Sequence, residues 1–266
     1  MSLVPIIYMD IELKLTPHYD YPNQIDNLKV GFQQRGTRNI IDIENCIIAT
    51  NAINEKYKEV RNSLKEKLAI SPKKKGATLL FRESENGHIE TNNNNLVTQI
   101  VCEVKFTFKA GEFFQNNLYI IPLMVQHVIQ QASGDGCNYM IDAYCGSGLF
   151  ALCAAKQFKT VYGVEVSELS IEAARYNAKQ NNITNSEFHN GLSEAIFDKV
   201  QHLNEEETVV VLDPPRKGCD MSFLQQLFNF KPKKIVYVSC DPAVYNIIII
   251  ISIVVCNIAI IIIRID

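Results

Sequence analysis

Apolar residues in the first third of the chain recur with spacings that predict a hairpin and a helix. Residues 30–32 and 40–43 are rich in apolar side chains and flank the polar, glycine-containing segment 33–39, a pattern typical of a β-hairpin. Along residues 52–68 apolar side chains recur every three or four positions, which places them on one face of a helix. These positions are Ile53, Tyr57, Val60, Leu64 and Leu68.

Two further strands are predicted before residue 110. One covers residues 77–81, directly after the basic run 73–75, and the other covers the alternating segment 96–108. Residues 1–28 are mixed in composition and poorly periodic. We therefore expect an N-terminal extension at 1–28, followed by a small α+β domain at 29–110.

From about residue 118 the pattern changes to short apolar strands that alternate with helices. Strands are predicted at 139–143, 161–166, 209–212 and 235–239, and helices at 149–157 and 170–180. This alternation predicts a parallel, doubly wound sheet whose ligands bind at the carboxyl ends of its strands. The expected fold class is therefore α/β, with a Rossmann-like domain at 111–246 after the small α+β domain.

The final segment, 247–266, is unusual because residues 247–263 are almost entirely isoleucine and valine. Its length is at the lower limit for a membrane-spanning helix, but it follows a predicted sheet strand within a few residues and has no capping signals. Three interpretations stay open: a transmembrane helix, a sequence outside the ancestral reading frame, and an unusual buried strand pair. We favour the second, and we expect no membrane partner.

Composition indicates the class of protein and its location in the cell, but it says little about function. The chain is 47% hydrophobic and 21% charged, as soluble globular proteins are, and its net charge of −3 provides no overall attraction to nucleic acid. Any RNA contact must therefore depend on local basic patches. The eight cysteines include no Cys-x-x-Cys pair, and the N-terminus lacks a signal-peptide pattern. We expect free thiols and an intracellular location, in the cytoplasm, the nucleus or the mitochondrion.

A glycine-rich turn and a later acidic residue indicate a nucleotide-type ligand. Residues 142–148 (DAYCGSG) follow a predicted strand and open a helix, and glycines there allow a ligand to approach the backbone. The next strand ends at Glu165, where a carboxylate can accept both hydroxyl groups of a ribose. The pair suits S-adenosylmethionine or a dinucleotide; an ordinary turn with a surface glutamate is the alternative.

Two later strands end in segments that carry further chemistry. Asp213 begins the proline-stiffened segment 213–218 (DPPRKG), in which Arg216 and Lys217 can hold a phosphate or an anionic intermediate. Cys240 follows the next strand, in 238–242 (VSCDP). A thiol at a strand terminus near basic residues is placed to act as a nucleophile, although a lone cysteine is often only a small buried apolar residue.

Five strings in this order resemble the RNA uracil-5-methyltransferase family, which modifies uridine in tRNA and ribosomal RNA. They are 31–46 (GF to DIENC), 113–117 (FFQNN), 142–150 (DAYCGSGLF), 212–218 (LDPPRKG) and 237–242 (YVSCDP). The similarity extends over about residues 14–245. Residues 13–22 and 73–82 further resemble the eukaryotic tRNA branch, which makes 5-methyluridine in the T loop.

The resemblance implies a cofactor, a nucleophile and an RNA partner. It implies a methyltransferase domain that binds S-adenosylmethionine through Gln115, Tyr144, Glu165 and Asp213. Cys240 matches the nucleophile that adds to C6 of uracil, so that C5 can attack the methyl group. The target uridine would have to leave its stack to reach the thiol. Expected partners are tRNA or another structured RNA, without DNA specificity, and a monomer is expected. Arg35, Arg38 and the run 73–75 are candidate phosphate contacts, or simply a solvated basic surface.

This sequence departs from the family in three ways. The family's proton-abstracting glutamate lies downstream of the nucleophile, whereas the carboxylates after Cys240 are only Asp241 and Asp266. Since general-base help is worth about 10²–10⁴-fold, a chain truncated there should bind cofactor and form the adduct but release product slowly. Few residues precede Gly31, so the N-terminal barrel of many relatives is not expected. Cys46 matches one ligand of an iron–sulfur site without its partners, so we expect no cluster and no metal.

Other functions stay open. The chain could methylate a different RNA base or a protein glutamine, since Asp-Pro-Pro loops also serve amino-group methylation, although such enzymes do not need a cysteine like Cys240. It could also be a non-catalytic RNA-binding remnant. A dinucleotide oxidoreductase fits least well, because the glycine motif is incomplete and the later loops are left unexplained.

Overall fold

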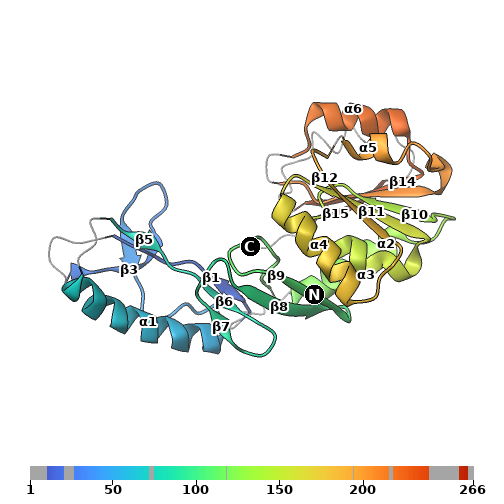
Figure 1. The fold of residues 1–266 in the computed structure, drawn as a ribbon. Coiled ribbons are helices and arrows are strands. Elements are labelled where there is room, and N and C mark those ends of the chain that lie inside the picture. The colour runs from blue at the N-terminus through green and yellow to red at the C-terminus, as the bar shows by residue number, and fades with distance from the viewer. Residues whose placement is uncertain are drawn as a thin grey trace, which may run out of the picture. The chain divides into compact units, whose positions relative to one another are not determined.

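The computed structural model describes most of the chain as two compact units. It describes residues 11–20, 27–71, 75–117, 119–193, 195–215, 218–239 and 258–262. Unit 1 comprises residues 1–99 and 109–119, and unit 2 comprises residues 100–108 and 120–266. The chain therefore passes between the units after residues 99, 108 and 119. Figure 1 labels the elements of both units.

Unit 1 combines short antiparallel strands with one long helix, α1 (Asn51–Ile70). Its described strands form a sheet in the order β4-β3-β2-β5 and a second sheet in the order β1-β6-β7. The strand bounds are Lys14–Leu15 (β1), His18–Tyr19 (β2), Val30–Gln33 (β3), Ile40–Asp42 (β4), Ala77–Thr78 (β5), Phe81–Glu83 (β6) and Ile89–Glu90 (β7). Part of the predicted N-terminal extension thus supplies β1 and β2 to these sheets.

The helix α1 forms where its apolar spacing predicted it and provides the core of unit 1. Thr50 caps its N-terminus, because the Thr50 side chain accepts a hydrogen bond from the Ile53 backbone N–H at 3.3 Å. Ile53, Leu64 and Leu68 are buried with Tyr57, whose hydroxyl lies 2.9 and 3.0 Å from the carbonyl oxygens of Val30 and Ile43. The helix is therefore fixed to the predicted hairpin β3–β4, which is confirmed.

Two of the predicted strands are wrong in detail. The segment 77–81 is split between β5 and β6, which belong to different sheets. The segment 96–108 is a hairpin of β8 (Leu96–Val101) and β9 (Val104–Lys109). Its turn consists of Cys102 and Glu103, whose φ angles of 48° and 68° lie in the left-handed region. Neither residue is a usual turn former, so the sequence carries no sign of this turn.

Unit 2 contains the predicted parallel sheet. Its six described strands follow the order β12-β11-β10-β13-β14-β15, and all pairs are parallel. The strand order reverses at β10, as in Rossmann-like folds, so the predicted α/β fold class is confirmed. The bounds are Tyr139–Asp142 (β10), Thr160–Glu165 (β11), Ser186–Asn190 (β12), Thr208–Leu212 (β13), Lys234–Ser239 (β14) and Ile258–Ile262 (β15).

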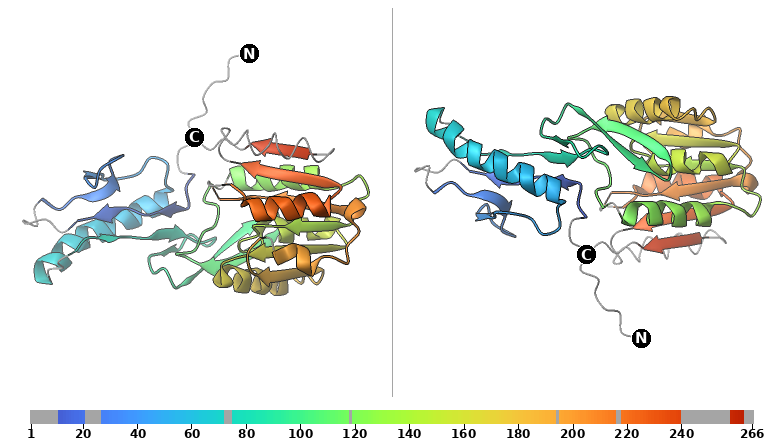
Figure 2. Two further views of the ribbon diagram at one scale, coloured as in Figure 1. Left: turned by 90° about the horizontal axis from the view of Figure 1, so that it is seen from above. Right: turned by 90° about the horizontal axis from the view of Figure 1, so that it is seen from below.

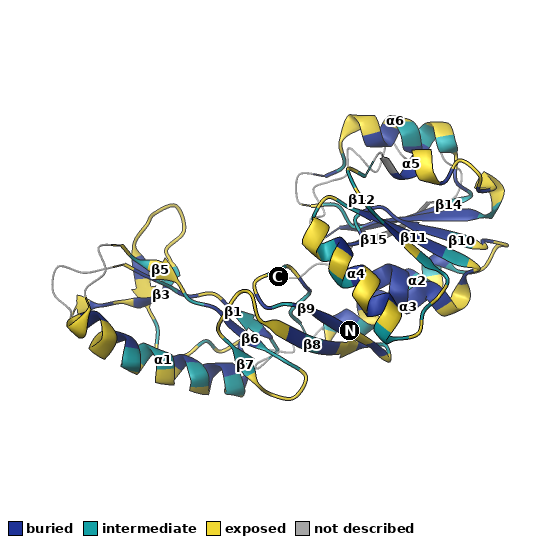
Figure 3. Ribbon diagram, viewed as in Figure 1, coloured by how far each residue is buried: buried dark blue, intermediate teal, exposed yellow. Residues whose placement is uncertain are grey.

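Helices cover both faces of this sheet. In Figure 1, α5 and α6 lie on one side, and α2, α3 and α4 lie on the other. Figure 3 shows the strands β10, β11 and β14 buried between these layers. This explains why the strands are nearly continuous apolar runs. The helix bounds are Ile120–Ala132 (α2), Leu149–Ala154 (α3), Glu168–Gln180 (α4), Ala195–Lys199 (α5) and Met221–Phe230 (α6), with single 3-10 turns at Ala155–Gln157 and Glu205–Glu207.

The isoleucine-rich tail contributes one described strand. β15 pairs in parallel with β14, from Ile235 opposite Ile258 to Ser239 opposite Ile262, and the two strands lie side by side in the left view of Figure 2. The rest of the tail lies outside the described residues. In the part of the chain that the structure describes, no helix has the length and apolar character needed to cross a bilayer.

Candidate active site

Three of the predicted cofactor residues lie along one edge of the sheet in unit 2. The strands β11, β10 and β13 are adjacent and parallel, so their carboxyl ends share that edge. Tyr144 lies in the loop after β10, Glu165 ends β11, and Asp213 directly follows β13. The structure therefore brings together residues that are about 70 positions apart in the sequence, as the strand pattern predicted.

The loop between β10 and α3 is held against β11. The Cys145 N–H donates to the Val164 carbonyl at 3.0 Å, and the Gly148 N–H donates to the Cys145 carbonyl at 2.8 Å. Gly148 has a φ of 89°, a conformation that disfavours side chains. At Gly163 a Cβ atom would lie 2.8 Å from the Cys145 sulfur. Glycine at that position thus lets the loop approach the strand.

Glu165 ties this loop to the next helix. One carboxylate oxygen accepts a hydrogen bond from the Gly146 N–H at 3.3 Å, and the other accepts one from the Ser167 N–H at 2.9 Å. Ser167 in turn caps α4 through a hydrogen bond from the Ser170 N–H at 3.3 Å. Each oxygen of Glu165 retains acceptor capacity, so the carboxylate can bind a pair of vicinal hydroxyl groups as well.

Tyr144 is half-buried and held from two sides. Its hydroxyl accepts a hydrogen bond from the Ser193 hydroxyl at 3.2 Å, and its ring packs edge-on against Phe223 with centroids 5.8 Å apart. Burial is the main reason why the pKa of Tyr144 is raised, and the neighbouring Cys219 thiol adds to this. The phenol therefore stays protonated, and its hydroxyl can serve as a hydrogen-bond donor.

Two aspartates at the same edge have raised pKa values. The pKa of Asp142 is raised to about 7, mainly by burial and in addition by the charges of Asp213 and Glu165, while hydrogen bonds from the Ala151 and Tyr144 N–H groups oppose the shift. Burial also raises the pKa of Asp213 to about 6. The charges of Asp213 and Glu165 thus act on Asp142, and a cationic ligand would offset this repulsion.

The structure adds residues to this edge that the sequence analysis did not select. Val166 and Leu192 follow the paired ends of β11 and β12 and are 67% and 57% exposed. They offer an apolar surface beside Glu165, on which a flat ring can pack. Asn177 is fully buried and donates to the Ser147 carbonyl at 3.2 Å, so it positions the glycine loop from α4. Val166 could have been selected from the sequence, because it is an apolar residue directly after the acidic residue that ends a strand. No sequence pattern indicates the role of Asn177.

Gln115 belongs to unit 1, in a segment held by a buried arginine. Arg82 donates to the Asn116 side-chain oxygen at 2.6 Å and to the Phe114 carbonyl at 3.4 Å, so it fixes both neighbours of Gln115. The N–H of Leu13 also donates to the Asn116 carbonyl at 3.0 Å. Arg82 is completely buried, which lowers the pKa of its guanidinium to about 10. The assignment of Gln115 to the cofactor stays a prediction.

Several predicted residues cannot be placed. Cys240, Arg216 and Lys217 lie outside the described residues, although Cys240 is the next residue after β14, which ends at Ser239. Among the residues that the structure describes, no three His, Cys, Asp or Glu side chains gather as a metal site would require. The prediction that no iron–sulfur cluster binds near Cys46 remains a prediction.

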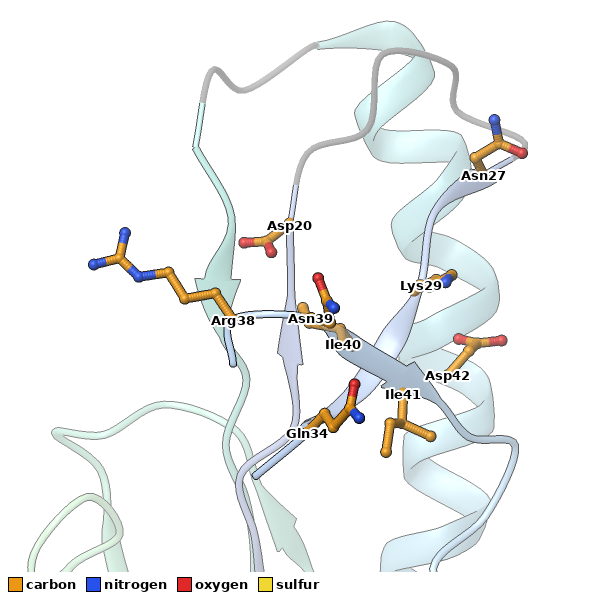
Figure 4. Close-up of a pocket in the computed structure, with 9 residues that line it drawn as sticks. All are labelled: Asp20, Asn27, Lys29, Gln34, Arg38, Asn39, Ile40, Ile41 and Asp42. Carbon is orange, nitrogen blue, oxygen red and sulfur yellow. The ribbon is translucent and has the colours of Figure 1, made fainter. Parts of the chain in front are cut away.

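One of the predicted basic residues of unit 1, Arg38, lines a pocket. Arg35 and Arg38 are exposed in the turn between β3 and β4, and Lys75 is exposed before β5, whereas residues 73 and 74 lie outside the described part. Arg38 and Lys29 line a pocket of about 680 Å³, and in Figure 4 the Arg38 side chain points away from the other lining residues. The lining also includes three amide side chains, two isoleucines and two carboxylates, Asp20 and Asp42, so the pocket has no net positive charge.

A family profile and two curated relatives with similar sequences are all described as tRNA uracil-5-methyltransferases. The sequence profile of the family described as tRNA (Uracil-5-)-methyltransferase matches residues 39–249. A tRNA (uracil(54)-C(5))-methyltransferase of Schizosaccharomyces pombe is 41% identical over 241 residues, which cover 86% of this chain and 45% of that protein. The protein of the same name from Saccharomyces cerevisiae is 35% identical, with the same coverage. The chain thus spans about half the length of these curated relatives.

A solved structure supports the fold. The tRNA (uracil-54, C5)-methyltransferase of Pyrococcus abyssi, in complex with S-adenosyl-L-homocysteine, superimposes with a TM-score of 0.65 at 20% sequence identity. The alignment covers 92% of this chain and 70% of that chain. At this identity the likeness establishes the shared architecture.

Proposed function

Because the chain belongs to the tRNA (uracil-5-)-methyltransferase family, we propose that it transfers a methyl group from S-adenosylmethionine to C5 of a uridine in tRNA. The observation that carries this proposal is the gathering of Tyr144, Glu165 and Asp213 at one edge of the unit 2 sheet, where β14 ends next to Cys240. The yeast relatives are named for uracil 54, which makes a uridine of the T loop the proposed target.

The edge fits S-adenosylmethionine group by group. The spare acceptor capacity of Glu165 suits the ribose hydroxyls, and the exposed side chains of Val166 and Leu192 suit the faces of an adenine ring. Asp213 directly follows β13 at the same edge and lies near the buried Asp142. These acids suit the positive charges of the amino group and the sulfonium. When bound, the cofactor supplies an electrophilic methyl group.

Cys240 is proposed to start the reaction on the base. Its thiolate adds to C6 of the uracil, which places negative charge on C5 and O4, and C5 then takes the methyl group. Loss of the C5 proton to a base restores the C5–C6 double bond and expels the Cys240 thiolate.

The RNA is proposed to bind through local charge. The whole chain is slightly acidic, at −3, so the exposed Arg35, Arg38 and Lys75 of unit 1 supply the phosphate contacts. The pocket bordered by Arg38 and Lys29 offers amide groups for base edges or sugars.

A tRNA that carries 5-fluorouridine tests the nucleophile directly. Fluorine at C5 cannot leave as a proton does, so the adduct with Cys240 should persist. We expect a protein–RNA band that survives denaturing electrophoresis and requires S-adenosylmethionine. Cys240→Ser should abolish it, and peptide mapping should place the RNA on Cys240. This readout does not depend on how fast product is released.

A matched control separates the nucleophile from other thiols. Cys46→Ser, in unit 1, should leave the covalent band unchanged. Methyl transfer to ordinary tRNA without any covalent band would contradict the adduct mechanism. Methyl transfer that survives Cys240→Ser would instead favour modification of another RNA base or of protein. Tight tRNA binding with neither methylation nor adduct would favour an RNA-binding role.

A further inference from the structure

Two thiols from distant parts of the sequence meet in unit 2, away from the edge that carries Glu165. Cys102 forms the turn between β8 and β9, and Cys153 lies near the end of α3. The Cys153 thiol donates to the carbonyl of Val101 at 3.6 Å, directly before Cys102. The Cys102 thiol donates to the Pro122 carbonyl at 3.9 Å, and the two thiols lie close enough to affect each other's pKa. Their sulfur atoms are therefore neighbours.

Both sulfurs border a pocket of about 410 Å³. Polar side chains such as Gln126, Lys156 and Asn181 line the same pocket. Cys102 is half-buried, whereas Cys153 is only 9% exposed. A small reagent that enters the pocket thus meets Cys102 first, and Cys153 is held behind it.

We propose that Cys102 and Cys153 are a reactive dithiol that closes to an intramolecular disulfide when a low-molecular-weight disulfide enters this pocket. The Cys102 thiolate attacks one sulfur of the reagent R–S–S–R, which forms a mixed disulfide and releases R–S⁻. Cys153 then loses its proton and attacks the Cys102 sulfur, and the second R–S⁻ leaves. The two protein thiols give up two electrons, and one reagent disulfide is reduced to two thiols.

The surroundings set the speed and the specificity of this exchange. Burial raises the pKa of Cys102 and of Cys153 above that of a free thiol, so little thiolate is present at neutral pH. The rate should therefore rise about tenfold per pH unit between pH 7 and 8.5, as the thiolate fraction does. The second step is fast by comparison, because it is intramolecular and the two thiols line the same pocket.

Closure would tie the β8–β9 turn to α3, the helix that follows the glycine loop. It would join residues 51 positions apart and restrict the unfolded chain. We expect the thermal midpoint of the oxidised protein to rise by about 5 °C or more. This chemistry is independent of the proposed methyl transfer.

Incubation of the native, full chain with oxidised glutathione tests the pair. Peptide mapping without reduction should find a Cys102–Cys153 disulfide as the main intramolecular product, and dithiothreitol should reverse the shift in thermal midpoint. Stable glutathionylation of Cys102 in the unmodified sequence, or other cysteines as the main linked pair, would overturn the proposal.

Single substitutions test which thiol attacks the reagent first and which thiol then closes the disulfide. Cys153→Ser removes the resolving thiol, so glutathione should stay attached to Cys102 in this variant. Cys102→Ser should take up at least tenfold less glutathione at Cys153, which is nearly inaccessible. Cys137→Ser removes another buried thiol of unit 2 and should leave the disulfide unchanged. Failure of Cys153→Ser to retain glutathione, while its fold is intact by circular dichroism, would contradict the assigned roles.

Discussion

At the scale of single residues, the Glu165 carboxylate combines a structural and a binding task. It accepts hydrogen bonds from the Gly146 and Ser167 N–H groups, so it joins the glycine loop to the start of α4. The same two oxygens are the proposed acceptors for the ribose of the cofactor. A substitution at Glu165 should therefore affect the ligand and the loop together.

Glu165→Gln should weaken binding of S-adenosylhomocysteine about ten- to a hundred-fold. An amide presents only one acceptor oxygen, and hydrogen bonds to a charged group are worth about 1.5–3 kcal/mol each. Isothermal titration calorimetry measures the change. Glu187→Gln alters an exposed carboxylate on the neighbouring strand β12 and should leave affinity within twofold. Equal affinities of the two variants would argue against ribose binding at Glu165.

The buried aspartates make the stability of unit 2 depend on pH. The pKa of Asp142 is raised to about 7 in the folded chain, above the ordinary value of 3.8. The folded state therefore holds a proton that the unfolded state releases. The resulting stabilisation is complete below about pH 4 and is lost as the pH rises through 7.

Asp142→Asn should remove most of this dependence, because an amide does not titrate. Between pH 5 and 7 the unfolding free energy of the unmodified chain should fall by about 1–2 kcal/mol more than that of the variant. Urea unfolding at several pH values measures the difference. Asp213→Asn should flatten the curve less, since the pKa of Asp213 is raised only to about 6. Parallel curves for the unmodified chain and Asp142→Asn would contradict the assignment.

At the scale of elements, the sequence predicts regular strands and fails at unusual turns. The strands around Tyr144, Glu165 and Asp213 are buried apolar runs, and parallel pairing brings their ends together. The β8–β9 turn escapes prediction because Cys102 and Glu103 adopt positive φ without being glycine or asparagine. Contacts such as that of Arg82 with the segment around Gln115 depend on distant packing. No local pattern indicates them.

The strain in the β8–β9 turn can be tested at Glu103, whose φ of 68° is sterically unfavourable for a residue with a side chain. Glu103→Gly should raise the unfolding free energy by about 0.5–1 kcal/mol, since glycine adopts this conformation freely. The exposed ion pair with Lys156, at 3.5 Å, is worth little. Lys105→Gly, within β9, should instead lower stability by about 0.5–1 kcal/mol. Chemical denaturation compares both variants; a loss of stability on Glu103→Gly would contradict a strained turn.

At the scale of the whole molecule, a net charge of −3 coexists with a proposed nucleic-acid partner. Binding then has to rely on a few cations rather than on the overall field. The exposed turn between β3 and β4 carries two of them, Arg35 and Arg38. RNA binding should therefore show a shallow salt dependence, set by a few contacts, and be sensitive to the loss of a single charge.

Arg38→Ala should weaken binding of all tRNAs to a similar degree and lower the slope of log affinity against log salt by about 1. This is the signature of one lost phosphate contact. Filter binding at several salt concentrations measures the slope. Lys56→Ala, on α1, removes a lysine already paired with Glu59 at 2.8 Å and should leave the slope unchanged. A preference for particular tRNAs after Arg38→Ala would indicate base recognition instead.

The division of the chain has a consequence for how the protein is made. Unit 1 is discontinuous, since residues 109–119 return to it after 100–108 have entered unit 2. These late residues matter, because Asn116 accepts hydrogen bonds from Arg82 and Leu13, and Asn117 forms a bridge with Glu12. During synthesis, unit 1 can complete its fold only after residue 117 has left the ribosome. A fragment that ends at residue 99 should therefore emerge as an unfinished domain.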